Sequence, residues 1–361
     1  MPRLYTQHAH SFRMKEKVKI ILPAEWEPQS AIQLTWPHED TDWNYMLEEV
    51  AACFITIAKE IIKWEILLIV CKDKQQVKAQ LGNVDFSRII FCEMTTNDTW
   101  ARDHAALSVF VNGEPCLLDF CFNGWGMKFA ANYDNLITRT LYKQGIFSPI
   151  VNYQNMLHCV LEGGSIESDG AGTILTTEEC LLSENRNEHQ TKEELEEYYK
   201  MVFGAKRILW LRSGYLAGDD TDSHIDTLAR FCNEHTIAYV QCTDETDEHF
   251  VELRLMEKEL KAFRTLDGNP YTFIPLPMAN CIMDGDDRLP ATYANFLIIN
   301  GAVLVPFYNS PKDEIARTQL QKAFPDREII GIDCLPLIKQ HGSLHCVTMQ
   351  FPEGFLPMVL Q

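Results

Sequence analysis

The first hundred residues alternate between short apolar runs and longer amphipathic segments. Residues 31–37 (AIQLTWP) form an apolar run typical of a buried strand, and residues 45–64 place apolar side chains three and four positions apart, which predicts a helix. Residues 65–71, 74–81 and 88–94 then read as strand, helix and strand. This alternation predicts an α/β chain.

Four β-hairpins of similar design follow. Residues 106–120 and 295–308 are two apolar runs interrupted by Asn-Gly, a pair typical of a tight hairpin turn. Residues 165–182 and 227–242 have the same form, with turns near Asp169–Gly170 and near Asn233.

A helix and a further strand are predicted after hairpins of this kind. The predicted helices are 133–145, 191–204 with Thr191 as N-cap, 248–263 and 312–324, and the predicted strands are 207–212, 271–277 and 328–333. The recurrence of hairpin, helix and strand predicts a closed ring of ββαβ modules. An open doubly wound sheet is the alternative, but it accommodates hairpins between its helices poorly.

Composition limits the class of protein and of ligand. Of 361 residues, 46% are hydrophobic, which is enough to bury a large core. Nothing in the chain forces a division, so a single domain over 1–361 is expected, with residues 1–15 as a mobile N-terminal extension. No secretory signal or membrane span is evident, and 12 cysteines without such a signal favour reduced thiols and a cytoplasmic location. The net charge of −19 disfavours nucleic acid and membrane partners and favours a cationic small molecule.

A polar residue stands at or just before the first strand of each predicted module. A ring would bring these residues to one axis, and they would form one site. They are Asp103, Glu162, His224 with Asp226, Asn295 and Cys346.

This set of side chains suits a guanidinium substrate. Carboxylates raise the pKa of a nearby thiol, so Cys346 needs a cation beside it to react as a thiolate. A guanidinium supplies that cation, and Asp103 and Asp226 can clamp its N–H edges. Cys346 would attack the guanidinium carbon, while His224, oriented by Glu162, would protonate the departing ammonia and later activate water.

Local spacing adds two expectations. His224 and Asp226 are two residues apart, so on a strand they would share one face. His345 adjoins Cys346, so on a strand it would face away from it. Arg102 is expected to be a structural ion-pair partner, and residues 123–129 to form a flexible lip over the pocket or an ordinary loop.

At these positions the chain resembles the agmatine deiminase family of the guanidine-modifying, or pentein, superfamily, which is related to bacterial peptidylarginine deiminase. The matching runs include TNDTWARDHA, LEGGSIESDGAGTILTTEECLLSENRN, SHID and GSLHCVTMQ. The resemblance implies a five-bladed α/β propeller, a homo-oligomer, and hydrolysis of agmatine to N-carbamoylputrescine and ammonia without a cofactor, in polyamine biosynthesis. It makes Cys346 the nucleophile, His224 the acid/base, Asp103, Glu162 and Asp226 the carboxylates, and places Trp100 beside the substrate.

Other residues are expected to complete the substrate site. Gly163 and Gly164 permit close backbone approach to a ligand, and Asn295 shares the position of the other site residues. The acidic run before His224 predicts that Asp220, or else Asp219 or Asp222, binds the distal ammonium of agmatine. No metal or nucleotide motif is present, so no cofactor is expected.

Three other functions use the same residues. The first is deimination of arginine or peptidyl-arginine on the same catalytic set. The second is a guanidinium-binding sensor without catalysis, which would not need the nucleophile. A cysteine peptidase or acyltransferase is the third, and three carboxylates are out of place where an oxyanion must be stabilised.

Overall fold

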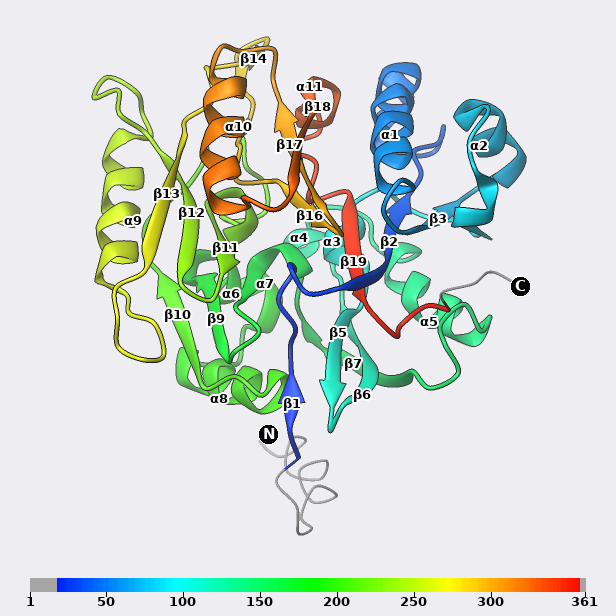
Figure 1. Cartoon of the computed structure of the whole chain (residues 1–361), viewed down its shortest axis with the longest axis horizontal. Coiled ribbons are helices and arrows are strands. Elements are labelled where there is room, and N and C mark those ends of the chain that lie inside the picture. The colour runs from blue at the N-terminus through cyan, green and yellow to red at the C-terminus, as the bar shows by residue number, and fades with distance from the viewer. Residues whose placement is uncertain (1–17, 358–361) are drawn as a thin grey trace.

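The computed structural model describes residues 18–357, and the extension predicted at 1–15 lies outside them. The described chain is a mixed α/β structure with strands in the interior and the longer helices around the outside (Figure 1). Five small sheets of three or four strands account for most of the strands. None of the sheets described within residues 18–357 closes on itself.

The five sheets share one construction. The first two strands pair antiparallel and the second and third pair parallel, and a helix connects the parallel pair. In chain order the sheets are β5(Leu107–Val111), β6(Glu114–Cys121), β7(Asn152–Val160); β8(Ile166–Ser168), β9(Thr173–Thr177), β10(Arg207–Leu211); β11(Ala229–Asn233), β12(Thr236–Gln241), β13(Thr272–Pro277); β16(Leu297–Ile299), β17(Ala302–Phe307), β18(Glu328–Asp333); and β19(Thr348–Pro352), β2(Gln29–Thr35), β3(Ile66–Cys71), β4(Ile89–Glu93).

The connecting helices cover the outer surfaces of the sheets (Figure 1). They are α1(Leu47–Ile61), α5(Ile137–Lys143), α8(Lys192–Phe203), α9(Phe250–Ala262) and α10(Lys312–Ala323), and α2(Lys74–Leu81) links β3 to β4. Short elements that matter below are α3(Ala101–His104), α4(Gly124–Met127), α7(Glu184–Asn187), η4(Gly163–Ser165) and η5(Ile225–Thr227). Strand β1(Ile20–Ile21) pairs antiparallel with β5 and is the fourth strand of the first sheet. The remaining elements are β14(Met283–Asp284), β15(Asp287–Arg288), α6(Glu178–Leu181), α11(Leu335–Ile338), η1(Asp42–Met46), η2(Phe86–Arg88) and η3(Asp134–Leu136).

The four predicted hairpins are confirmed, and so are the helices and strands predicted after them. At the first hairpin, Asn112 has φ 53° and Gly113 φ 88°, the left-handed backbone that a two-residue Asn-Gly turn requires. Strand β7 was not predicted, because polar residues in its sequence NYQNMLHCV interrupt the apolar run.

The fifth sheet joins segments from opposite ends of the chain. Strand β19 pairs antiparallel with β2, with Met349 opposite Gln33, and the two strands lie side by side in Figure 1. All residues of both strands are buried. Among residues 18–357, no helix is both long and apolar enough to span a bilayer.

Candidate active site

The polar residues singled out above occupy equivalent places in the five sheets. Each lies in the short turn or helix that leads into the first strand of its sheet. Asp103 is in α3 before β5, Glu162 is the N-cap of η4 before β8, His224 and Asp226 flank the start of η5 before β11, Asn295 precedes β16, and Cys346 precedes β19. The expectation that His224 and Asp226 lie on a strand is wrong, because the chain turns there to enter β11.

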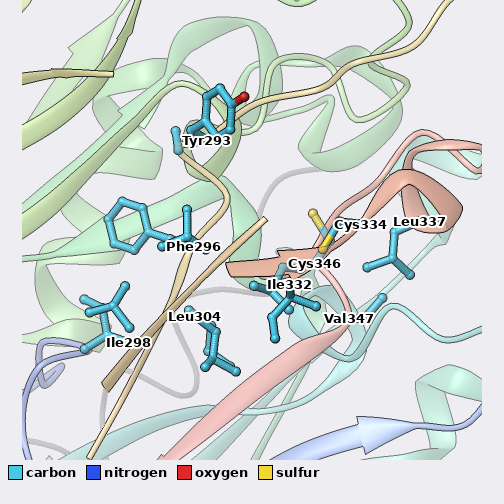
Figure 2. Packing of buried hydrophobic residues seen from close by; sticks show 14 of the residues in the cluster. Tyr293, Phe296, Ile298, Leu304, Ile332, Cys334, Leu337, Cys346 and Val347 are labelled. Carbon is cyan, nitrogen blue, oxygen red and sulfur yellow. The ribbon is translucent and has the colours of Figure 1, made fainter. Parts of the chain in front are cut away.

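Cys346 lies at the bottom of the site and is 4% exposed. Figure 2 shows it within the largest apolar cluster, with Ile332, Cys334 and Val347. Its Sγ is 3.4 Å from Asn295 Oδ1 and 3.8 Å from Asp226 Oδ2. Burial, with the charges of Asp226 and Asp103, raises the pKa of the Cys346 thiol well above its usual value. Without a ligand the thiol is therefore protonated.

His224 lies between two buried carboxylates. Its Nδ1 is 3.7 Å from Asp103 Oδ1 and its Nε2 is 3.9 Å from Glu162 Oε2. Burial alone lowers the pKa of His224, but Asp103 and other neighbouring groups outweigh it and raise the pKa well above the usual value. Neither ring nitrogen has a hydrogen-bond partner within the described chain, and the same is true of the buried Asp226 Oδ1. These polar atoms are available to a ligand.

Glu162 is held by an arginine that the sequence analysis did not identify. Arg186 Nε donates to both carboxylate oxygens of Glu162, at 3.0 and 2.9 Å, and both side chains are fully buried. Burial raises the pKa of Glu162, but His224 and Arg186 together lower it below the usual value. Arg186 lies in α7, within the quoted run LLSENRN, but nothing in its spacing pointed to the site.

The two glycines after Glu162 let the backbone approach the site. A Cβ on Gly164 would lie 2.6 Å from His224 Nδ1 and 2.9 Å from Asp103 Oδ1. The Gly164 N–H instead donates to Asp103 Oδ1 at 3.0 Å. A Cβ on Gly163 would meet the Arg102 carbonyl oxygen at 2.2 Å, so neither position accommodates a side chain.

A pocket leads from the surface to Cys346. Aromatic side chains form its walls, and Trp125 Nε1 donates to Asp103 Oδ2 at 2.9 Å. Trp125 and Phe129 belong to the predicted lip at 123–129, which does border the pocket. The lining residues are Asp42, Asp98, Trp100, Asp103, Trp125, Phe129, Asp220, Thr221, Gln340, His341, Gly342 and Cys346.

Of the three acidic residues before His224, only Asp220 lines this pocket. Asp219 accepts hydrogen bonds from Thr221 and from the Ser223 N–H within its own loop. Asp222 pairs with Lys128 and Arg186, each at 2.6 Å. Burial, with the charge of Asp219, raises the pKa of Asp220 to about 6. The loop therefore presents one of its three carboxylates to a ligand.

A family model described as Porphyromonas-type peptidyl-arginine deiminase matches residues 21–352. The chain belongs to this family. It is also 30% identical over 371 residues to the agmatine deiminase of Pseudomonas aeruginosa (strain LESB58), covering 96% of this chain and 97% of that protein.

Solved structures of family relatives superpose closely on this chain. One, described as the "Putative Arginine Deiminase" of Porphyromonas gingivalis, is 55% identical with a TM-score of 0.91, covering 94% of this chain and 100% of the other. The C. jejuni agmatine deiminase with substrate bound is 38% identical with a TM-score of 0.88, covering 94% and 98%.

The residues next to Asp103 and Cys346 in the sequence, Arg102 and His345, contact other polar groups. Arg102 pairs with Glu25 at 3.0 Å, as expected of a structural ion pair. His345 and Cys346 lie in a turn before β19, so the reason given for His345 facing away, strand alternation, is wrong. His345 Nδ1 is 2.7 Å from Asp226 Oδ2, so this histidine contacts a site residue although it does not line the pocket.

Two clusters in the described chain have ligand atoms spaced closely enough for a metal ion. They are Glu162, Cys180 and His224, and Glu25, Glu167 and His345. Each already contains an arginine, Arg186 on Glu162 and Arg230 on both Glu25 and Glu167. A guanidinium occupies the carboxylate oxygens and repels a second cation, so neither cluster suits a metal.

Proposed function

We propose that this protein is a guanidine deiminase that hydrolyses agmatine to N-carbamoylputrescine and ammonia. The observation that carries the proposal is a buried thiol beside Asp226, with a buried histidine and Asp103 beyond it, at the end of an acidic pocket. The agmatine deiminases among its relatives, one of them solved with substrate bound, support the same reaction.

The covalent steps follow from these positions. Asp103 and Asp226 accept the guanidinium N–H groups, and the positive charge favours the Cys346 thiolate, so the thiol proton passes to solvent as the substrate binds. The sulfur attacks the guanidinium carbon, and protonated His224 gives its proton to the leaving nitrogen, so that ammonia departs and a thiouronium remains. His224 then takes a proton from water, whose oxygen attacks the same carbon, and collapse breaks the C–S bond to release the ureido product.

The pocket lining favours agmatine over free arginine. Three carboxylates, Asp42, Asp98 and Asp220, line it beyond Asp103, and the lining contains no lysine or arginine. The α-carboxylate of arginine would meet like charges there, whereas the ammonium of agmatine would not. Trp100 forms an apolar wall for the methylene chain, and Asp220 is our proposed partner for the ammonium.

Deimination of arginine or peptidyl-arginine is the second candidate. It is favoured by the family model and by the name of the 55% identical Porphyromonas gingivalis protein. Both candidates use the same five catalytic residues, so only the distal part of the substrate separates them.

We also propose a fold type, a cellular location and an oligomeric state for the protein. The five like-built sheets are assigned as blades of one propeller over a single domain, because equivalent turns of all five meet at the site. Twelve free thiols support a cytoplasmic location, and a homo-oligomer is expected from the family. Size-exclusion chromatography with light scattering tests the oligomer.

The test of the function is ammonia and ureido product measured from agmatine, free arginine and a blocked arginine peptide. Cys346→Ala should lower agmatine turnover by more than about a thousandfold, since covalent catalysis is lost. Cys281→Ala, at an exposed thiol, should retain full turnover. Turnover of arginine or peptide alone would contradict the agmatine assignment, and guanidine binding without turnover would indicate a sensor.

A further inference from the structure

A buried histidine contacts Asp226 from the side away from the substrate pocket. His345 is 1% exposed and does not line the pocket that holds Trp100. Its Nδ1 is 2.7 Å from Asp226 Oδ2, and its Nε2 is 2.8 Å from Glu25 Oε1. Glu25 lines a different surface pocket, beside β19. A line of contacts therefore connects Asp226 to another region of the surface.

The far end of this line is rigidly held. Glu25 accepts hydrogen bonds from Arg102 NH1 at 3.0 Å, Arg230 NH2 at 2.6 Å and Gln350 Nε2 at 2.9 Å. Arg230 is fully buried. These contacts fix the Glu25 carboxylate, and the carboxylate in turn fixes the imidazole of His345.

The partners of His345 indicate where its hydrogens lie. An ionised carboxylate only accepts hydrogen bonds, so we place a hydrogen on Nδ1, which Asp226 Oδ2 accepts at 2.7 Å. By the same rule Nε2 donates to Glu25 Oε1 at 2.8 Å. Asp226 Oδ1 has no partner among the described residues, so His345 holds one oxygen and leaves the other for a ligand.

We propose that His345 is a positioning residue for the deiminase reaction, whose Nδ1–H holds Asp226 ionised and oriented for the guanidinium while Glu25 anchors the ring from behind. This inference rests on the proposed function of the site. It predicts that loss of the Nδ1 donor lowers turnover and raises the reactivity of the free Cys346 thiol.

The two properties are turnover and thiol reactivity. A buried carboxylate that loses its donor takes up a proton more readily, so Asp226 becomes neutral. A neutral Asp226 clamps the guanidinium poorly, and turnover falls. The same neutral group no longer opposes ionisation of Cys346, 3.8 Å away, so the free thiol reacts faster with a neutral alkylating agent.

Two substitutions separate the nitrogens of the ring. In His345→Asn the side-chain amide can reach the position of Nδ1, whereas in His345→Gln it reaches that of Nε2. We expect His345→Gln to lower kcat/KM for agmatine by about ten- to a hundredfold, and iodoacetamide to modify Cys346 at least about threefold faster. His345→Asn should lose less than about tenfold in kcat/KM and keep the slow alkylation.

The measurement uses mass spectrometry of the Cys346 peptide in a Cys281→Ala background, with thermal melting as a check of folding. Equal losses in both variants, or unchanged alkylation in His345→Gln, would overturn the proposal. If His345→Gln does not fold, Asp226→Asn provides the second test. It should itself speed alkylation, and adding His345→Ala, which removes the Nδ1 donor, should speed it no further, whereas a further increase in the double variant would overturn the proposal.

The alkylation result does not depend on the substrate. If the wild-type protein turns over no guanidine, the proposed function fails. The change in Cys346 reactivity would still report whether His345 controls the charge of Asp226.

Discussion

The thiol of Cys346 is kept unreactive by the residues that would bind its substrate. Burial and the carboxylates of Asp226 and Asp103 raise its pKa, so in the free protein it carries its proton. A guanidinium between those carboxylates reverses the local field and favours the thiolate. The nucleophile is therefore activated by cationic ligands and protected from neutral electrophiles, which makes charge the first criterion of substrate selection.

The pH dependence of the reaction should report Asp103. Burial, with the charges of Asp226 and Glu162, raises the pKa of Asp103 to about 6, although His224 opposes the shift. Asp103 therefore becomes neutral as the pH falls through about 6, and the guanidinium loses one partner. We expect kcat/KM for agmatine to fall about tenfold per pH unit below that value.

Steady-state kinetics between about pH 5 and pH 8 test this expectation. Asp103→Asn should be poorly active throughout and show a shallower acid limb, because Asp220, whose pKa is also raised to about 6, still titrates there. Asp286→Asn, at an exposed turn, should keep the wild-type profile. An acid limb that persists unchanged in Asp103→Asn would assign it to another group.

At the scale of elements, the same position of five sheets supplies the site. Each functional side chain sits in a turn or short helix leading into a first strand, where the backbone is free of ladder hydrogen bonds and the side chain can point inward. The sheets themselves hold these turns in place, because each is backed by a connecting helix. This arrangement separates the residues that do chemistry from those that stabilise the fold.

The sequence predicted those turns and helix ends that depend only on residues close together in the chain. The Asn112–Gly113 turn and the Thr191 cap follow from short-range rules, and both are observed. The sequence analysis missed Arg186, because its partners Glu162 and Asp222 are brought to it only by the packing of α7. The strand assumed at His224 was wrong, because polar alternation alone does not separate a strand from the turn before it.

Helix α8 provides a test of stability that should not affect the site. Thr191 Oγ1 accepts from the Glu194 N–H at 3.2 Å, and Glu194 Oε2 accepts from the Thr191 N–H at 2.9 Å, which is a capping box. Thr191→Ala should lower the free energy of unfolding by about 1 kcal/mol and leave kcat unchanged.

Urea unfolding and agmatine turnover, measured on the same preparation, check this prediction. The matched control is Thr318→Ala in α10, where the hydroxyl donates back to the Glu314 carbonyl and caps no helix end. A loss of stability equal in the two variants would mean that the capping box contributes little.

At the scale of the whole molecule, the net charge of the chain and the charge of the pocket lining are both negative. The chain carries a formal net charge of −19, and four aspartates line the pocket that leads to Cys346. A field of this sign raises the local concentration of cations and speeds their encounter with the site. We therefore expect the acidic composition to speed the capture of a cationic substrate.

Salt should weaken that capture. Raising the ionic strength from about 0.01 M to about 0.5 M shortens the screening length to a few ångströms, so kcat/KM for agmatine should fall several-fold. Alkylation of Cys346 by iodoacetamide, which is neutral, is the control and should change little. An agmatine kcat/KM that is insensitive to salt would show that long-range attraction does not limit capture.

The pairing of β19 with β2 has a consequence for biosynthesis. Strand β2 is made early, but its antiparallel partner, and the nucleophile just before that partner, are made nearly last. A nascent chain whose synthesis has not yet reached Cys346 already contains the carboxylates and His224 but lacks the thiol. The protein therefore cannot attack a guanidine until translation has passed β19, so incomplete chains are inert toward the substrate.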